Sequence, residues 1–216
     1  MSKLPGSENF FIDGPAGRLE TLLESPRERQ TTGGAVICHP HPEHGGTMQN
    51  KVAHTLARAF VAKGFCVLRF NFRGVGQSDG AFDEGEGEFQ DAMSAVQAMR
   101  DRSGALPLWL AGFSFGAAIA IRAAAETGAK GLVSVAPAVS RVSRQAKTQP
   151  DCPWLIIQGD KDDLVALDDT IAWVNDLEPG PELKIFPGTD HFFHGKLVEL
   201  RKAVEEFIEH TINKPG

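Results

Sequence analysis

The sequence has little cysteine and no excess of positive charge, and each absence excludes a class of protein. Its three cysteines, Cys38, Cys66 and Cys152, are odd in number and lie far apart among 216 residues. They form neither a disulfide framework nor a CxxC pair, so we expect reduced thiols. Lys and Arg number 22 against 28 Asp and Glu, a formal charge of −6. Because phosphate binding needs a basic surface, this balance argues against nucleic acid or membrane as partner, and mildly against strongly anionic substrates.

Long hydrophobic runs are also absent. No apolar run approaches the roughly 18 residues that a membrane span needs, and the start, MSKLPGSENFF, lacks the apolar core of a signal peptide. We therefore expect a cytoplasmic protein. No repeat, low-complexity tract or linker marks a boundary, so residues 1–216 are expected to form one domain. A hydrophobic fraction of 42% is ordinary for a globular chain of this length, which can bury a full core.

The sequence does contain short apolar runs in alternation with longer helical patterns. A predicted hairpin comes first, with strands over 9–12 and 18–23 around a five-residue turn at 13–17. Continuous apolar runs then predict strands covered on both faces, at 35–38, 65–70, 108–111, 132–136 and 154–158. Helical spacing predicts helices at 52–60, 89–96, 119–123 and 171–177, and a strand over 183–186 precedes a closing helix over 197–208.

This alternation predicts an α/β fold, a doubly wound and mostly parallel sheet with an N-terminal antiparallel hairpin at its edge. In such sheets ligands bind beyond the carboxyl ends of the strands. Functional residues are therefore to be sought where the predicted strands end.

A candidate nucleophile stands at the end of the strand over 108–111. Residues 112–116 read GFSFG, and small residues of a helix follow at once. A GxSxG motif between strand and helix holds its serine on a tight turn, and the two glycines let strand and helix approach closely. The motif predicts Ser114 as nucleophile. The N–H of Phe115 would lie at the helix N-terminus, where it favours a developing oxyanion.

A nucleophilic serine needs a base and an orienting carboxylate, which the α/β-hydrolase order places later in the chain, acid before histidine. The strand over 154–158 runs into GDKDDLV, where Asp160, Asp162 and Asp163 compete for the role of the acid. We favour Asp162, because the GxxDxxV spacing returns this carboxylate toward the histidine loop. Asp160 is expected to face solvent and Asp163 to point into the loop or cap the next segment.

The candidate bases follow the last predicted strand, in the segment GTDHFFHG. His191 precedes the closing helix, whereas His194 is expected in or near the first turn of that helix. A histidine in a loop can turn its ring toward the serine, so we favour His191, with its ring nitrogens shared between Asp162 and Ser114.

A loop rich in histidine and proline follows the first parallel strand, with CHPHPEHGGT at 38–47. His39, His41, His44 and Glu43 could in principle bind zinc. However, the prolines break any regular spacing of ligands. A loop at this strand end also suits the second half of an oxyanion hole. Since proline has no N–H, the backbone of His41 is the expected donor, and we favour this interpretation over a metal site.

The segment RGVGQSDG at 73–80 superficially resembles a dinucleotide-binding loop, but its third glycine is one residue late and acidic residues follow, which would repel a phosphate. We interpret it as a structural turn in which Arg73 bonds nearby carboxylates.

Together, CHPHPEHGGTMQNK, RFNFRGVGQSDG, GFSFG, GDKDDLV and GTDHFFHG resemble, in this order, the compact bacterial α/β-hydrolase carboxylesterases, relatives of the dienelactone hydrolases. The resemblance implies an α/β-hydrolase fold with Ser114, Asp162 and His191 as triad and the N–H groups of Phe115 and His41 as oxyanion hole. Dienelactone hydrolases proper use cysteine where Ser114 stands, so their substrate does not carry over. Only residues 137–153 occupy the place where many relatives insert a lid, which implies little or no lid and an open site.

The resemblance implies hydrolysis of short-chain carboxylic esters through an acyl-enzyme, without a metal or other cofactor and with a small-molecule ester as the partner. We assign Phe113 and Phe192, which flank the motif residues, to substrate binding in an apolar acyl pocket, with core packing as the alternative. Thioesterase, amidase, peptidase and acyltransferase activities are compatible with the same triad, and a non-catalytic member of the fold is a further alternative. The sequence leaves the oligomeric state open.

Overall fold

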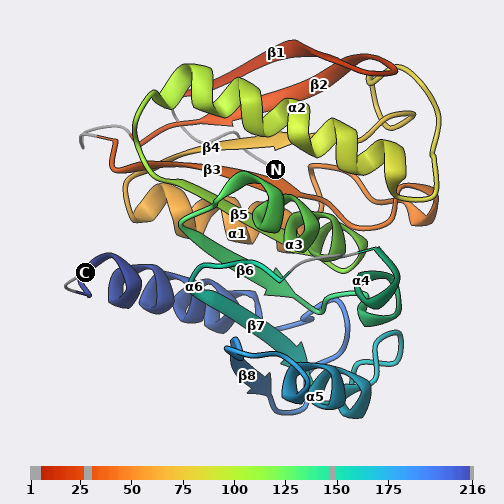
Figure 1. Cartoon of the computed structure of the whole chain (residues 1–216), viewed down its shortest axis with the longest axis vertical. Coiled ribbons are helices and arrows are strands. Elements are labelled where there is room, and N and C mark those ends of the chain that lie inside the picture. Colours follow the sequence, from red (N-terminus) through yellow and green to blue (C-terminus); the bar gives the residue numbers. More distant parts are fainter. Residues whose placement is uncertain (1–5, 27–30, 146–148, 215–216) are drawn as a thin grey trace.

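The five continuous apolar runs form the centre of one eight-stranded sheet (Figure 1). The computed structural model describes residues 6–26, 31–145 and 149–214. The central strands are β3 (Gly33–Cys38), β4 (Phe65–Phe70), β5 (Leu108–Phe113), β6 (Gly131–Val135) and β7 (Trp154–Gly159). They pair in parallel, and every residue of β3, β5, β6 and β7 is buried. Because helices cover both faces, these strands need no polar alternation.

The order of the strands is β1-β2-β4-β3-β5-β6-β7-β8, with the predicted antiparallel hairpin at one edge. The outer strands are β1 (Ser7–Gly14), β2 (Gly17–Glu24) and, at the other edge, β8 (Glu182–Phe186). The predicted five-residue turn was wrong, because strand pairing continues through Asp13 with Arg18 and Gly14 with Gly17. Two residues therefore make the turn, and Gly17 allows it with a φ of +119°.

Helices cover the two faces of the sheet (Figure 1). One face carries α1 (Lys51–Ala62) and α6 (Leu197–Ile212), and the other carries α2 (Glu86–Ser103), α3 (Phe115–Thr127), α4 (Val139–Gln145) and α5 (Leu167–Asn175). Beneath α1 and α6, the rings of Phe60, Phe65 and Trp109 meet edge to face, with centroids 5.4 to 5.8 Å apart. A second core lies beneath α2 and α3.

The helix α4 was not predicted from the sequence, because VSRVSRQ is short and has no clear apolar period. Between β6 and β7 the described residues form α4 and no other helix or strand, so the fold has the small connection expected in place of a lid. None of the helices that the structure describes is long and apolar enough to cross a membrane. The architecture is thus the predicted doubly wound, mostly parallel sheet with its N-terminal hairpin.

Candidate active site

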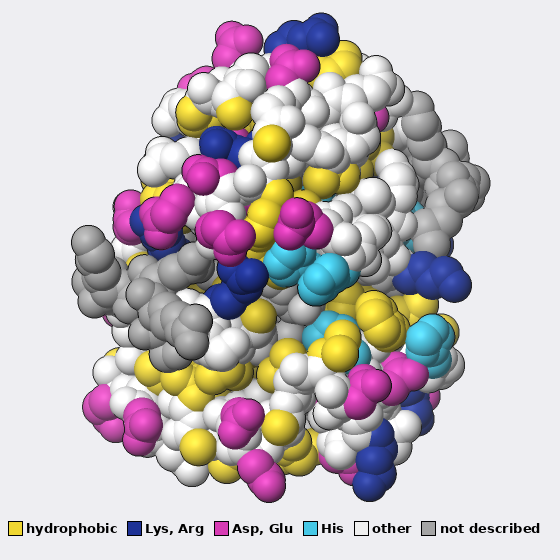
Figure 2. Space-filling view, turned by 90° about the vertical axis from the view of Figure 1, so that its right-hand side faces the viewer, with side chains coloured by type: hydrophobic (Ala, Val, Ile, Leu, Met, Phe, Trp, Pro, Cys, Tyr) yellow, Lys and Arg dark blue, Asp and Glu magenta, His cyan; other side chains and the backbone are white. Residues whose placement is uncertain are grey.

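The carboxyl ends of three strands bring the predicted triad residues to one edge of the sheet. Ser114 follows β5, Asp162 lies in the turn after β7, and His191 lies in the loop after β8. Figure 2 shows the molecule from the side of these strand ends. Histidine side chains gather near the middle of this face, with hydrophobic side chains beside them. Parallel strands share one carboxyl edge, which is why residues so far apart in sequence can meet there.

Ser114, His191 and Asp162 form one chain of hydrogen bonds. His191 Nδ1 lies 2.7 Å from Asp162 Oδ2, and His191 Nε2 lies 3.0 Å from Ser114 Oγ. An ionised carboxylate can only accept, so Nδ1–H donates to Asp162. In the neutral ring Nε2 is then an acceptor for the Ser114 hydroxyl. The side chains of His191 and Asp162 are buried, which shields the hydrogen bond between them from water, whereas Ser114 is half-buried.

The backbone of Ser114 adopts the strained turn that the GxSxG motif predicts. Its φ and ψ are 55° and −119°, a conformation rare for any residue but glycine. A Cβ on Gly112 would lie 2.3 Å from the carbonyl oxygen of Gly116. A Cβ on Gly116 would lie 2.2 Å from the carbonyl oxygen of His39. Both glycines are therefore required sterically, because β5, the turn at Ser114 and the end of β3 lie in van der Waals contact.

Asp162 is held in place by more than His191. It accepts hydrogen bonds from the N–H groups of Leu164 at 2.9 Å and Val165 at 2.8 Å, and from Gln158 Nε2 at 2.9 Å. Burial raises the pKa of this carboxyl, but the hydrogen bonds from His191 and the backbone outweigh burial and lower the pKa below its ordinary value. Asp162 is therefore ionised at neutral pH. Gln158 was not singled out in the sequence, although an amide in a fully buried strand could have drawn attention to it.

The two competing aspartates have other positions. Asp160, expected to face solvent, is half-buried, and its Oδ1 accepts from the N–H of Gly188 at 2.6 Å and of Thr189 at 3.4 Å. Asp160 thus ties the turn after β7 to the loop that carries His191. Asp163 is exposed.

His194 lies near the first turn of the closing helix, as the sequence predicted. The helix α6 begins at Leu197, three residues later. Its side chain is exposed, and its Nδ1 lies 2.6 Å from Asp190 Oδ2. His194 therefore pairs with a surface carboxylate.

The histidine–proline loop contains one histidine whose two ring nitrogens are both bonded. His39 is fully buried; its Nε2 accepts from the N–H of Phe72 at 3.1 Å, so Nδ1–H donates to the carbonyl oxygen of Pro40 at 2.7 Å. Burial lowers the pKa of His39 to about 4, and the ring is neutral. The described residues contain no group of three or more His, Cys, Asp or Glu placed to hold a metal ion. The geometry thus gives no support to the zinc alternative.

Hydrogen bonds from β4 hold the chain after this loop. The guanidinium of Arg69 donates to the carbonyl oxygen of Met48 at 2.5 Å, and the N–H of Met48 donates to Asn71 Oδ1 at 2.8 Å. Arg69 is itself buried and paired with Glu24 at 2.8 Å. These residues were not identified from the sequence, because partners 21 to 45 positions apart show no local pattern.

The proposed oxyanion donors are unengaged within the described part of the chain. None of its hydrogen bonds is donated by the backbone N–H of Phe115 or of His41. Their role in an oxyanion hole stays a prediction, and the free N–H groups are consistent with it.

The two phenylalanines assigned to substrate binding lie in different surroundings. Phe113 is fully buried, and its ring packs against His191 with centroids 5.0 Å apart. This burial corrects the assignment of Phe113 to an acyl pocket: its ring supports the base from within the core. Phe192 is 47% exposed and lies beside His191, with centroids 5.2 Å apart.

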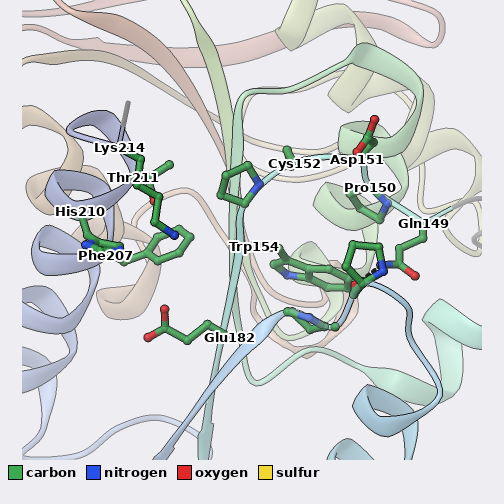
Figure 3. Close-up of a pocket in the computed structure, with 14 residues that line it drawn as sticks. Gln149, Pro150, Asp151, Cys152, Trp154, Glu182, Phe207, His210, Thr211 and Lys214 are labelled. Carbon is green, nitrogen blue, oxygen red and sulfur yellow. Dashed lines mark hydrogen bonds between the residues drawn. The ribbon is translucent and has the colours of Figure 1, made fainter. Parts of the chain in front are cut away.

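A cavity of about 740 Å³ opens next to these residues. Its walls are the segment 47–52, which leads from the histidine–proline loop into α1, and the segment 192–197, which follows His191. We call it the loop cavity. A smaller cavity of about 440 Å³ lies where β7 and β8 begin and α6 ends (Figure 3). Trp154, Glu182 and Phe207 are among its lining residues. It lies at the amino-terminal ends of the strands, opposite the triad, and none of the triad residues lines it.

Arg73 has the structural role that the sequence predicted. Its guanidinium and its backbone N–H bond the carboxylate of Asp91, at distances from 2.8 to 3.2 Å. Asp91 is buried on α2, so the pair fastens the turn at 73–80 to that helix. This segment is a structural turn.

Comparisons with known proteins agree with the fold. The family model described as serine aminopeptidase, S33, matches residues 31–150. A lidless α/β serine hydrolase from Xanthomonas campestris is 38% identical, with a TM-score of 0.91 over 100% of both chains. An α/β serine hydrolase homologue from Coxiella burnetii is 40% identical, with a TM-score of 0.89 over 95% of this chain and 99% of that one. An uncharacterized protein from Rickettsia prowazekii is 34% identical over 92% of this chain and 87% of its own length.

Proposed function

The chain belongs to the serine aminopeptidase S33 family of α/β serine hydrolases, and from this premise we propose that it is a carboxylesterase acting on short-chain esters. The observation that carries the proposal is the hydrogen-bonded chain from Ser114 through His191 to Asp162 at the carboxyl edge of the sheet. A kinship with dienelactone hydrolases in particular stays a prediction from the sequence motifs.

The proposed reaction is acyl transfer in two steps. His191 Nε2 takes the proton of Ser114 as Oγ attacks the ester carbonyl, and it returns the proton to the leaving alcohol. Asp162 stabilises the imidazolium formed in between. The N–H groups of Phe115 and His41 would stabilise the negative oxygen of the tetrahedral intermediate. Water, activated by the same histidine, then attacks the acyl-enzyme and releases the acid.

The family's name raises aminopeptidase activity as a second candidate. A peptide's free amino terminus is cationic, and a site for it needs a carboxylate near the nucleophile. The loop cavity has no acidic residue in its lining and contains Lys51 instead. Within this cavity, the charge of Lys51 disfavours a cationic amino terminus, which supports the ester proposal for a substrate bound there.

The first test is hydrolysis of 4-nitrophenyl acetate and butanoate, with a serine-reactive phosphonate to label the nucleophile. Ser114→Ala should lower kcat by about 10³-fold or more and abolish the one-to-one mass adduct. Ser94→Ala, a serine on α2 outside the site, is the matched control and should react normally. Full turnover by Ser114→Ala would refute the proposal.

A second comparison separates the alternatives. An ester, a thioester and an amide of one acyl group should be hydrolysed with the ester strongly preferred over the amide. Preference for an aminoacyl amide would favour the aminopeptidase instead.

A further inference from the structure

The loop cavity lies directly beside the catalytic base. One wall, 192–197, begins with the residue after His191, and the exposed ring of Phe192 touches the imidazole edge to face, with centroids 5.2 Å apart. The other wall, 47–52, belongs to the segment that Arg69 and Asn71 hold from β4. Its volume of about 740 Å³ is within the range of small-molecule sites. Phe192 therefore belongs both to this cavity and to the surroundings of His191.

The two walls of this cavity differ in chemistry. Phe192 and Leu197 supply apolar surface, while Thr47, Gln49 and Lys51 supply polar groups. Lys51 is exposed and makes no ion pair with any residue that the structure describes. His194, on the other wall, pairs with the carboxylate of Asp190 at 2.6 Å, and the lining itself contains no acidic residue. The lining thus carries an uncompensated positive charge at one side of an apolar surface.

The position of this cavity relative to His191 indicates which half of an ester it would hold. After the tetrahedral intermediate forms, Nε2 must donate a proton to the leaving oxygen, so that oxygen lies within hydrogen-bond reach of His191. Groups attached to the leaving oxygen then extend along the side of the imidazole. The exposed ring of Phe192 packs against one side of the imidazole and also lines the loop cavity.

We propose that the loop cavity binds the alcohol half of the substrate, and that Lys51 makes the enzyme prefer alcohols that carry a carboxylate next to an apolar or aromatic body. Natural substrates would then be short-chain acyl esters of hydroxy acids. The inference rests on the proposed esterase function. The net charge of the chain argued mildly against strongly anionic substrates. The inference refines that expectation, since the molecule is acidic as a whole while this cavity is locally basic.

The test uses two pairs of esters. In the first pair the acyl group is acetyl, and the alcohol is either 4-(hydroxymethyl)benzoate or the neutral 4-methylbenzyl alcohol. In the second pair the alcohol is 4-methylbenzyl alcohol, and the acyl group is either succinyl, which carries a free carboxylate, or butanoyl. The ratio of kcat/KM, charged over neutral, is measured for each pair in the wild type, in Lys51→Met and in Lys51→Glu.

In the first pair the ratio should fall by about two- to fivefold in Lys51→Met, the effect of one exposed ion pair, and further in Lys51→Glu. The wild-type ratio should also fall as salt is added, because exposed charges are screened. Lys202→Met, a lysine on α6 outside the lining, is the matched control and should keep the wild-type ratio. Intrinsic differences in reactivity within a pair cancel, since each variant meets the same two esters.

Two results would overturn the inference. A first-pair ratio that is equal in wild type and both Lys51 variants would mean that Lys51 does not select carboxylates. An equal or larger fall in the second pair would place the cavity on the acyl side. Neither result affects the esterase proposal, which fails only if the neutral esters are not hydrolysed or if Ser114→Ala still hydrolyses them.

Discussion

Ser114 adopts a backbone conformation that costs about 1–3 kcal/mol, and its neighbours compensate for it. Its N–H donates to the carbonyl oxygen of Val135 at 2.9 Å, and its own carbonyl oxygen accepts from Ala117 at 3.0 Å and Ala138 at 3.3 Å. These contacts come from β6, α3 and the segment before α4. The conformation therefore depends on the packing of several elements around the turn, and it directs the hydroxyl toward His191.

At the scale of single residues, Asp162 should be the acid on which His191 depends. Asp162→Asn keeps the shape of the side chain but removes the charge that stabilises the imidazolium and the acceptor that selects the Nδ1–H tautomer. We expect kcat for a nitrophenyl ester to fall by about three to four orders of magnitude. The measurement is steady-state kinetics at pH 7.

Asp163→Asn is the control for that variant, because Asp163 is exposed in the same turn. It should keep wild-type kcat and KM. Loss of activity in Asp163→Asn together with retention in Asp162→Asn would reverse the assignment.

At the scale of elements, the site depends on the contact of β3 with the first turn of α3. Gly116 lies at this contact, where a Cβ would meet the carbonyl oxygens of His39 at 2.2 Å and Cys38 at 2.4 Å. Backbone oxygens of a buried strand end cannot move aside easily. The close approach that Gly116 allows brings the histidine–proline loop next to the nucleophile.

Gly116→Ala should therefore destabilise the protein by about 1–3 kcal/mol, although alanine is the better helix former, and it should lower kcat. The stability is measured by urea denaturation and the activity with a nitrophenyl ester. Gly180→Ala is the control, because a Cβ there meets its nearest atom, the carbonyl oxygen of Leu177, at 3.5 Å. Equal stability of Gly116→Ala and the wild type would contradict the steric account.

At the scale of the whole molecule, the buried neutral His39 couples the stability of the fold to pH. Its pKa is about 4 in the fold, against an ordinary value of 6.5. Between these values the unfolded chain binds a proton at this residue and the folded chain does not, so the free energy of unfolding falls as the pH falls. From pH 7 to pH 5 this residue should remove about 2 kcal/mol of stability.

His39→Gln should make the difference in stability between pH 7 and pH 5 smaller by about 2 kcal/mol, whatever its effect at pH 7. Urea denaturation at the two pH values measures this difference. His41 and His54, whose pKa values burial also lowers, are present in both proteins and cancel. His210→Gln, an exposed histidine on α6, should keep the wild-type difference. An unchanged difference in His39→Gln would mean that His39 is not the responsible group.

Much of the fold and the candidate triad could be predicted because their signals are local. Continuous apolar runs mark buried parallel strands, and Ser114 and Asp162 follow two of them, β5 and β7. His191 follows the last strand, β8, which is only partly buried. The length of the hairpin turn and the helix α4 were missed. Each depends on where pairing or a helix stops, and that is decided by weak contacts of the neighbouring residues.

The sequence by itself determined the order of strands and helices, the strained serine turn and the choice of residues at the strand ends, because periodicity and short motifs express local backbone preferences. Only the tertiary structure decided that Phe113 packs beneath the base, that Asp160 holds the histidine loop, and that Arg69 and Asn71 hold the chain at Met48. These contacts join residues from different strands and loops. Their partners are chosen by the packing of the whole sheet, so no local pattern records them.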